Sequence, residues 1–150
     1  MSNDVSTTVP LTEQSLRAFA VDWYQALDRH DDLAAVQIKL VPDGLDMVFP
    51  ETTTHGLTGF AEWYRTVTNK FFDEVHEVRS TEVVSLTAQR AEITVLVNWK
   101  ASKWTPPAAR SERLDFDALQ RWTVVAGPNG PLISRYVVET FDPNPGSAAL

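Results

Sequence analysis

The chain contains no cysteine among its 150 residues. It therefore cannot form a disulfide framework, a thiolate zinc site or a cysteine nucleophile, and we expect it in a reducing compartment such as the cytoplasm. It also lacks any run of about 20 apolar residues that could span a bilayer. The opening segment, MSNDVSTTVP, has neither the basic start nor the apolar core of a secretion signal. We expect no membrane partner and no export.

Positive charge is scarce: 13 lysines and arginines stand against 20 acidic residues, for a net charge of −7. Nucleic-acid binding needs a cluster of basic side chains facing the phosphates, and the sequence has none. The histidines, His30, His55 and His76, show neither the HxH nor the HExxH spacing of a preformed metal site. We therefore expect no nucleic-acid partner, no metal and no cofactor.

What is present describes one folded domain. Apolar residues make up 43% of the chain, which is long enough to bury its own core. Residues 1–10 are predicted to be a flexible arm that ends at Pro10. Residues 11–143 are predicted to form the domain. Residues 144–150 are predicted to be a flexible tail, because DPNPGSAAL is rich in proline and small residues.

Helical periodicity marks the first half of the domain. Thr12 can cap a helix that continues to the polar segment DRHDD, and a shorter helix is predicted within residues 33–40. The run LDMVF is predicted to be a short strand, and FPETTTHG a loop after it. A third helix is predicted from near Thr58 to about Phe71.

The second half has the two-residue period of strands. Turn signals separate four segments rich in β-branched and aromatic residues, which predict an antiparallel meander over residues 77–87, 91–104, 113–125 and 131–141. In the third of these, the even-numbered positions are apolar except Gln120. Helices followed by strands predict an α+β domain, with helices covering the apolar face of a sheet.

This order of elements resembles the nuclear transport factor 2-like superfamily. The segments that carry the resemblance are HGLTGFAEWY after the short strand and YVVETFDP at the end of the last one, and it covers about Leu11 to Pro143. Members include SnoaL-like polyketide cyclases, ketosteroid isomerases, scytalone dehydratases and limonene epoxide hydrolases, besides non-enzymatic domains. The resemblance implies a cone-shaped α+β fold, with three N-terminal helices packed on a curved, mostly antiparallel sheet. It also implies an internal cavity and a homodimer formed through the sheet.

The chain departs from these enzymes at the positions that carry their chemistry. Isomerases that resemble it place a base carboxylate at the end of the first short strand, where this sequence has Phe49. Their second acid, on the penultimate strand, falls near Gln120, which can donate a hydrogen bond but cannot titrate. Epoxide hydrolases of this fold have an aspartate near the position of Glu139, but the arginine that bridges their acids has no counterpart here.

Two residues are candidate acid–base groups. His55 lies in FPETTTHG at the expected cavity mouth, and an imidazole titrates near neutrality. Glu139, if it points inward, would be a carboxyl group in apolar surroundings, as a general acid requires. The alternatives are that His55 only caps the next helix and that Glu139 lies on the outer face. Strand alternation does not decide the direction of His76, and His30 is expected at the surface.

An excess of aromatic side chains predicts an apolar pocket for a planar small molecule. The residues predicted to line it are Trp23, Tyr24, Phe49, Phe60, Trp63, His76, Trp99, Gln120 and Trp122.

The favoured hypothesis is a SnoaL-like cytoplasmic homodimer that binds an apolar small molecule. It would act without a cofactor as an isomerase, cyclase, dehydratase or hydrolase, with His55 or Glu139 moving a proton and Gln120 polarising a carbonyl. One alternative is a non-catalytic ligand-binding domain. The other is a dimerisation or interaction module whose sheet face carries Asn98, Lys100 and Ser102, and whose cavity is filled by its own tryptophans.

Overall fold

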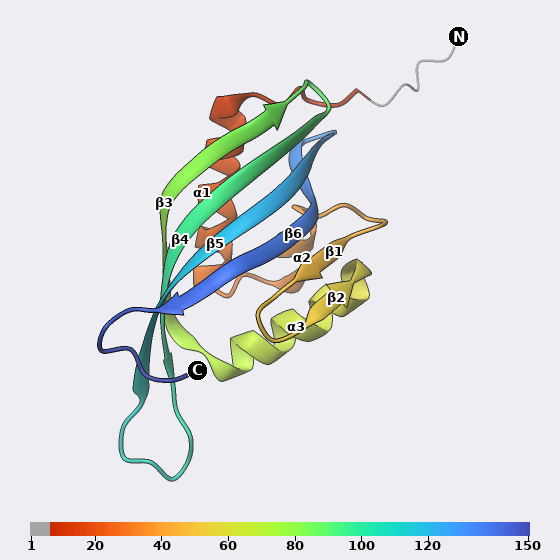
Figure 1. Cartoon of the computed structure of the whole chain (residues 1–150). Coiled ribbons are helices and arrows are strands. Elements are labelled where there is room, and N and C mark those ends of the chain that lie inside the picture. Colours follow the sequence, from red (N-terminus) through yellow and green to blue (C-terminus); the bar gives the residue numbers. More distant parts are fainter. Residues whose placement is uncertain (1–6) are drawn as a thin grey trace.

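The computed structural model describes residues 7–150. The predicted arm lies outside the described residues except for its last four positions. The chain forms an α+β domain in which helices cover one face of a single sheet (Figure 1). The elements are α1 Glu13–Asp28, α2 Leu33–Gln37, β1 Asp46–Val48, β2 Thr53–His55, α3 Gly56–Lys70, β3 Phe72–Leu86, β4 Arg90–Lys103, β5 Glu112–Gly127 and β6 Gly130–Pro143.

The ends of the first helix follow from local chemistry. Thr12 caps α1 as predicted, and its hydroxyl and that of Ser15 form a reciprocal capping box. At the other end, His30 takes a left-handed backbone conformation with φ of 51°. Its amide donates to Leu27 O, and the next amide donates to Ala26 O, so the helix closes in a Schellman motif. Asp28 thereby becomes the last helical residue and faces β3.

The third helix begins directly from a strand. Gly56 has a φ of 70°, which a glycine adopts without a Cβ clash, and its amide donates to Leu45 O at 2.7 Å. This turn lets the chain pass from β2 into α3 without a separate loop. Within residues 7–150, no helix is long and apolar enough to cross a membrane.

The six strands are ordered β2-β1-β6-β5-β4-β3. The four long strands form the predicted antiparallel meander, and β1 pairs parallel to β6. The prediction that FPETTTHG is entirely loop was wrong, because Thr53–His55 pairs antiparallel with β1 as β2. Three residues of mixed polarity give too short a pattern to separate from a loop, and only the pairing with β1 makes them a strand.

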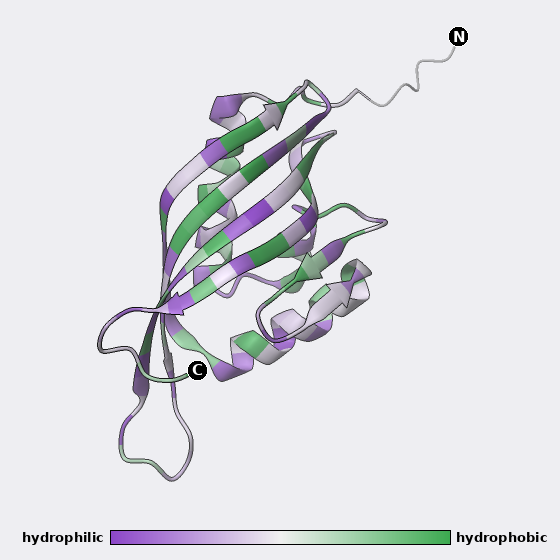
Figure 2. Cartoon of the chain, viewed as in Figure 1, coloured by the Kyte–Doolittle hydropathy of each residue, from purple (hydrophilic) through white to green (hydrophobic). Residues whose placement is uncertain are grey.

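The alternation predicted for β5 is confirmed, whereas on β4 it breaks down after Val97, because Asn98 and Ser102 are buried. On β5 the even positions from Leu114 to Val124 are buried, including Gln120, and their side chains face the helices. Figure 2 shows the same alternation as bands along the strands. The core between helices and sheet is centred on an aromatic cluster in which Trp122 contacts Phe19, Trp23 and Tyr136.

The tail after β6 has no regular structure but is held by side-chain hydrogen bonds. Asn144 donates to Asp115 and Asp117 on β5, and Asn98 of β4 donates to the same two carboxylates. These hydrogen bonds, from Asn98 and then Asn144, lower the pKa of both aspartates. Asn98 and the tail residue Asn144 therefore share the same two acceptors, and the predicted flexibility of residues 144–150 stays a prediction about motion.

Homodimerisation through the sheet also stays a prediction. Leu96 and Leu119 pair across β4 and β5 on the face away from the helices, where they are only partly buried. If this face forms the dimer, light scattering after size exclusion will give about twice the chain mass of 16.8 kDa. The variant Leu119→Arg will then reduce the mass to that of one chain, because an unpaired charge would be buried at the interface. A wild-type mass of one chain at high protein concentration would contradict the prediction.

Candidate functional site

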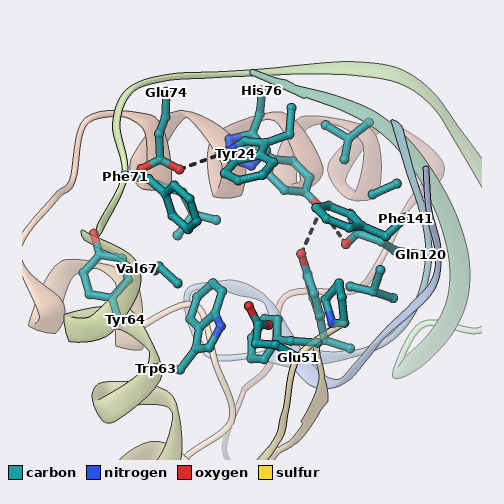
Figure 3. Close-up of a pocket in the computed structure, with 18 of the residues that line it drawn as sticks. Tyr24, Glu51, Trp63, Tyr64, Val67, Phe71, Glu74, His76, Gln120 and Phe141 are labelled. Carbon is teal, nitrogen blue, oxygen red and sulfur yellow. Dashed lines mark hydrogen bonds between the residues drawn. The ribbon is translucent and has the colours of Figure 1, made fainter. Parts of the chain in front are cut away.

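A pocket opens between α1, α3 and the inner face of the sheet (Figure 3). Its volume is about 100 Å³. Its wall is mainly aromatic and aliphatic, and the polar side chains among the lining residues come from α1, α3, β3, β5, β6 and the loop after β1. The polar lining residues are Tyr24, Glu51, Tyr64, Thr68, Glu74, His76, Gln120 and Tyr136.

His76 is clamped to one carboxylate. Its Nδ1 lies 2.5 Å from Asp28 Oδ1, and its backbone amide donates to Asp28 Oδ2 at 2.8 Å. Since an ionised carboxylate only accepts, Nδ1 carries the proton and Nε2 of the neutral ring is left as an acceptor. The imidazole side chain is 11% exposed, and it stacks on the Tyr24 ring with centroids 4.7 Å apart. The ring is therefore fixed in both tautomer and orientation on the pocket wall.

A second polar group lies deeper in the pocket. Gln120 Oε1 accepts hydrogen bonds from the Tyr24 hydroxyl at 2.6 Å and from Trp122 Nε1 at 3.1 Å. Because the carbonyl oxygen takes both bonds, the amide N–H groups of Gln120 are left as donors. The Tyr136 hydroxyl lies 3.1 Å from that of Tyr24 and donates to it, since the Tyr24 proton is directed to Gln120.

Both phenols stay protonated at neutral pH. Burial raises the pKa of Tyr24 well above its usual value, and burial raises the pKa of Tyr136 to about 12. The pocket floor therefore offers neutral hydrogen-bond donors and carries no charge.

Glu74 adds a buried carboxylate on the same wall as His76 (Figure 3). Its side chain is only 8% exposed. Oε1 accepts a hydrogen bond from Trp99 Nε1 at 3.0 Å, and Oε2 pairs with His30 Nε2. His30 was expected at the surface and is partly exposed there, and the turn after α1 also brings its ring to Glu74.

The rest of the wall is aromatic. Trp63 stacks on Phe49 with ring centroids 3.8 Å apart, and Phe71 packs edge-on against Trp99. Tyr64 also lines the pocket, but its hydroxyl donates to Asp31 O at 2.6 Å, and burial raises its pKa to about 12.

The mouth and the charges of the pocket limit what can bind. Exposed lining residues, Pro50, Glu51 and Leu150, mark the opening to solvent. No lysine or arginine of residues 7–150 lines the pocket, so an anionic group would find no counter-charge there. Across the same residues, no cluster of three or more histidine, aspartate or glutamate side chains is arranged to hold a metal ion.

Six of the nine predicted pocket residues lie on the pocket wall. They are Tyr24, Phe49, Trp63, His76, Trp99 and Gln120. The other three, Trp23, Phe60 and Trp122, are completely buried in the core behind it. Periodicity assigns a residue to the inner side of an element, but it does not separate the layer that faces the cavity from the layer that packs beneath it.

Neither predicted catalytic residue lies on the pocket wall. His55 is at the end of β2, where its side chain is 76% exposed and its Nδ1 lies 2.6 Å from Asp46 Oδ1. It lines a surface hollow beside α3 that adjoins the pocket mouth, with Glu51, Trp63 and Leu150 among the residues common to both. Glu139 is exposed on β6, so the apolar surroundings that would make it a general acid are absent.

Sequence reasoning missed three residues of the candidate site: Asp28, Glu74 and Tyr136. The first two lie in the segments DRH and EVH, each of which holds an acid and a histidine two residues apart. That repeated spacing was the available signal. Its meaning is visible only when α1 packs against β3, because the acid of each segment then meets the histidine of the other.

Comparisons with known proteins define the fold. No protein-family model matches the sequence, and no curated protein gives a significant match. Among solved structures, a ketosteroid isomerase-like protein from Erwinia carotovora atroseptica is 20% identical, over 85% of this chain and 96% of that one, with a TM-score of 0.65. A candidate scytalone dehydratase from Novosphingobium aromaticivorans is 14% identical, over 91% and 94% of the two chains, with a TM-score of 0.69.

A third similar structure is a hexachlorocyclohexane dehydrochlorinase, LinA type 3, from Novosphingobium barchaimii. It is 12% identical, over 91% of this chain and 92% of that one, with a TM-score of 0.70. Matches at this level of identity establish the fold. The chain therefore has the nuclear transport factor 2-like fold that its sequence resembled, shared with ketosteroid isomerase-like and dehydratase-like proteins.

Proposed function

We propose that the protein is a lyase or isomerase that removes a proton from a carbon atom of a neutral, apolar small molecule, with His76 as the general base. The observation that carries the proposal is the clamp between His76 and Asp28 on the wall of an apolar pocket. An imidazole is suited to proton transfer near neutral pH, and a carboxylate on Nδ1 stabilises the imidazolium that forms.

The direction of proton transfer follows from the tautomer. With its Nδ1 proton donated to Asp28, His76 presents the lone pair of Nε2 as the accepting site. Stacking on Tyr24 and two hydrogen bonds to one carboxylate restrict the ring, so little reorganisation is needed when substrate binds. A carbon acid next to Nε2 would lose its proton to a base that is already oriented.

The donors on the pocket floor suit the charge that such a step creates. Proton loss next to a carbonyl places negative charge on its oxygen, and preorganised donors stabilise that charge most in a dry site. The Gln120 amide is the group available for this role, because its carbonyl oxygen takes the hydrogen bonds from Tyr24 and Trp122 and leaves its N–H groups as donors. The proposal keeps the role that the sequence predicted for Gln120, which is to polarise a carbonyl group. It replaces His55 and Glu139 by His76 as the residue that moves the proton.

The names of the similar structures support this reaction class. A dehydratase removes water and a dehydrochlorinase removes hydrogen chloride, and both reactions include loss of a proton. A ketosteroid isomerase moves a proton within its substrate. The three named reactions have proton removal from the substrate in common, and the site proposed here would perform that step.

The pocket suits a small neutral ring compound. A cavity of about 150 Å³ lined by apolar groups can hold benzene, and the volume here is about 100 Å³ with an open mouth beyond it. Among residues 7–150, the ionisable acidic and basic side chains on the wall are those of Glu51, Glu74 and His76, and no lysine or arginine lies among them. Carboxylated, phosphorylated or sulfated compounds would therefore be repelled.

The proposal is tested with 5-nitrobenzisoxazole, a flat neutral compound. Removal of its ring proton by a base breaks the N–O bond and releases a coloured cyanonitrophenolate. The wild-type protein is expected to show saturable turnover. Asp28→Asn is expected to lower kcat about 100-fold or more, because the amide would donate to Nδ1 and place the remaining ring proton on Nε2. The matched control is Asp22→Asn, an exposed position on the same helix, with unchanged kcat.

Other outcomes would redirect the proposal. Turnover that survives in Asp28→Asn at the wild-type rate would refute the role of the clamp. Binding of the probe with no turnover, seen as quenching of tryptophan fluorescence, would favour the alternative of a non-catalytic ligand-binding domain.

A further inference from the structure

The acid and the histidine of DRH pair crosswise with those of EVH. Asp28, at the end of α1, binds His76 on β3, and His30, just after α1, binds Glu74 on the same strand. Only the first of these pairs is used by the reaction proposed above. In the second pair, Glu74 is buried on the same pocket wall and His30 is partly exposed, and this pair has no assigned role.

Glu74 lies between the pocket and the molecular surface. It lines the pocket, and it also lines a surface hollow formed with His30, Asp73 and Arg113. The His30 side chain is 29% exposed, whereas Glu74 is 8% exposed. A proton can therefore pass from solvent to His30, from His30 to Glu74, and from Glu74 into the pocket without crossing an apolar barrier.

The backbone around this pair is unusual. Within residues 7–150, the only non-glycine residues with positive φ are His30 and Asp73, both at 51°. Such conformations cost about 1 kcal/mol or more each, and they concentrate at functional sites. Asp73 lies in a bulge of β3 between Phe72 and Val75, and a bulge redirects the side chains beside it. Glu74 and His76 are two residues apart on β3, so strand alternation puts both on the pocket wall.

We propose that Glu74 is a second catalytic acid, which protonates the group that leaves the substrate while His76 removes the carbon-bound proton. His30 is the positioning residue that supplies Glu74 with its proton. The inference rests on the function proposed above and deepens it. It assigns the reaction to eliminations whose leaving group needs a proton, such as loss of water from a β-hydroxy ketone.

The step balances without any added reactant. His76 Nε2 takes the proton on the carbon next to the carbonyl, and the electron pair of that C–H bond forms the new C=C bond. The C–O bond to the hydroxyl breaks with its electron pair, and the oxygen takes the proton from Glu74 and leaves as water. Glu74 regains a proton from His30, His30 from solvent, and His76 releases its own.

The positions of the two groups set the geometry of the reaction. Glu74 and His76 are two residues apart on one strand, so their Cα atoms are roughly 7 Å apart by strand geometry. Both side chains face the pocket (Figure 3). A base and an acid on one wall can reach neighbouring atoms on one face of a flat substrate. The structure therefore implies that proton and hydroxyl depart from the same side.

The test compares two probes that differ in their need for an acid. The phenolate released from 5-nitrobenzisoxazole leaves without protonation, whereas 4-hydroxy-4-phenylbutan-2-one must lose its hydroxyl as water. Glu74→Gln keeps the shape of the side chain and an oxygen acceptor for Trp99. It is expected to lower kcat for dehydration about 100-fold or more. The loss of kcat for 5-nitrobenzisoxazole is expected to be smaller by about 10-fold or more, because that leaving group needs no proton. Glu77→Gln, on the outer face of the same strand, is the matched control and should change neither rate.

The role of His30 needs a variant that keeps its contact. In His30→Gln the side-chain amide can still donate to Glu74, but it cannot exchange a proton with solvent. The expected result is a lower kcat for dehydration with an unchanged KM. An equal rise in KM would instead show that His30 only holds the wall in place, which would overturn the relay.

The outcomes separate this inference from the function on which it rests. Equal loss of both reactions in Glu74→Gln, with a normal circular dichroism spectrum, would mean that the carboxylate is structural. Equal retention of both would also overturn the inference. A wild-type protein that opens 5-nitrobenzisoxazole through His76 but never dehydrates the hydroxy ketone would reject the acid role and leave the base intact. The proposed function itself would be rejected if turnover of 5-nitrobenzisoxazole did not depend on Asp28.

Discussion

Replacement of His76 by asparagine is expected to lower kcat for 5-nitrobenzisoxazole by about 10²–10⁴-fold. Asparagine can place its N–H where Nδ1 of the histidine lies, so the hydrogen bond to Asp28 is retained. What disappears is Nε2, the only basic atom of the side chain that is not engaged with Asp28. The substitution therefore removes the base and leaves its anchor. The measurement is the rate of release of the coloured phenolate across a range of probe concentrations.

The informative comparison is His55→Asn. His55 also places Nδ1 against an aspartate, at 2.6 Å from Asp46, but its side chain is 76% exposed and outside the pocket. The sequence pattern predicts a loss of activity in this variant, and the pocket geometry predicts none. Loss of turnover in His55→Asn with none in His76→Asn would return the catalytic role to the loop FPETTTHG.

The largest effect on stability is expected for Trp122→Ala, which should lower the free energy of unfolding by about 3–5 kcal/mol. Trp122 is completely buried, and its ring contacts Phe19, Trp23 and Tyr136. Removal of the indole leaves a cavity in a close-packed core and deprives Gln120 of a hydrogen-bond donor. Urea unfolding followed by circular dichroism measures the change.

Trp104→Ala is the matched control for this experiment. Trp104 is 52% exposed in the loop after β4, and its Nε1 donates to Ala108 O. Its replacement should change the free energy of unfolding by less than about 1 kcal/mol, because little apolar area returns to water. Similar losses in both variants would show that the aromatic cluster around Trp122 contributes less packing energy than its burial implies.

Most of the fold could be predicted because each element carries its own period. Leu16, Ala20 and Trp23 repeat at helical spacing and are buried on α1, whereas Ile93, Val95 and Val97 are buried on β4 and alternate with the partly buried Thr94 and Leu96. The residues that decide such patterns lie next to one another in the chain. β2 was missed because three residues are too few for a period, and its pairing with β1 comes only from tertiary contact.

The candidate site was predicted less well than the fold. Tyr24, Trp63 and Gln120, which were expected at the pocket, line it in the structure, because their elements present a clear inner face. The acid–base group was placed on His55 and Glu139, and the structure puts both outside the pocket. A histidine beside a loop of hydroxyl groups looks reactive in sequence, but proton transfer depends on what surrounds the ring in space.

The sequence by itself determined the class of the domain, the faces of its helices and strands, and its resemblance to the nuclear transport factor 2-like superfamily, since these depend on the local order of apolar and polar residues. Only the tertiary structure decided which acid meets which histidine. Asp28 and His76 are 48 residues apart, and His30 and Glu74 are 44 apart. Their pairing depends on the turn that ends α1 and on the bulge that begins β3, and no local pattern contains the distance between two segments that meet only when the chain is folded.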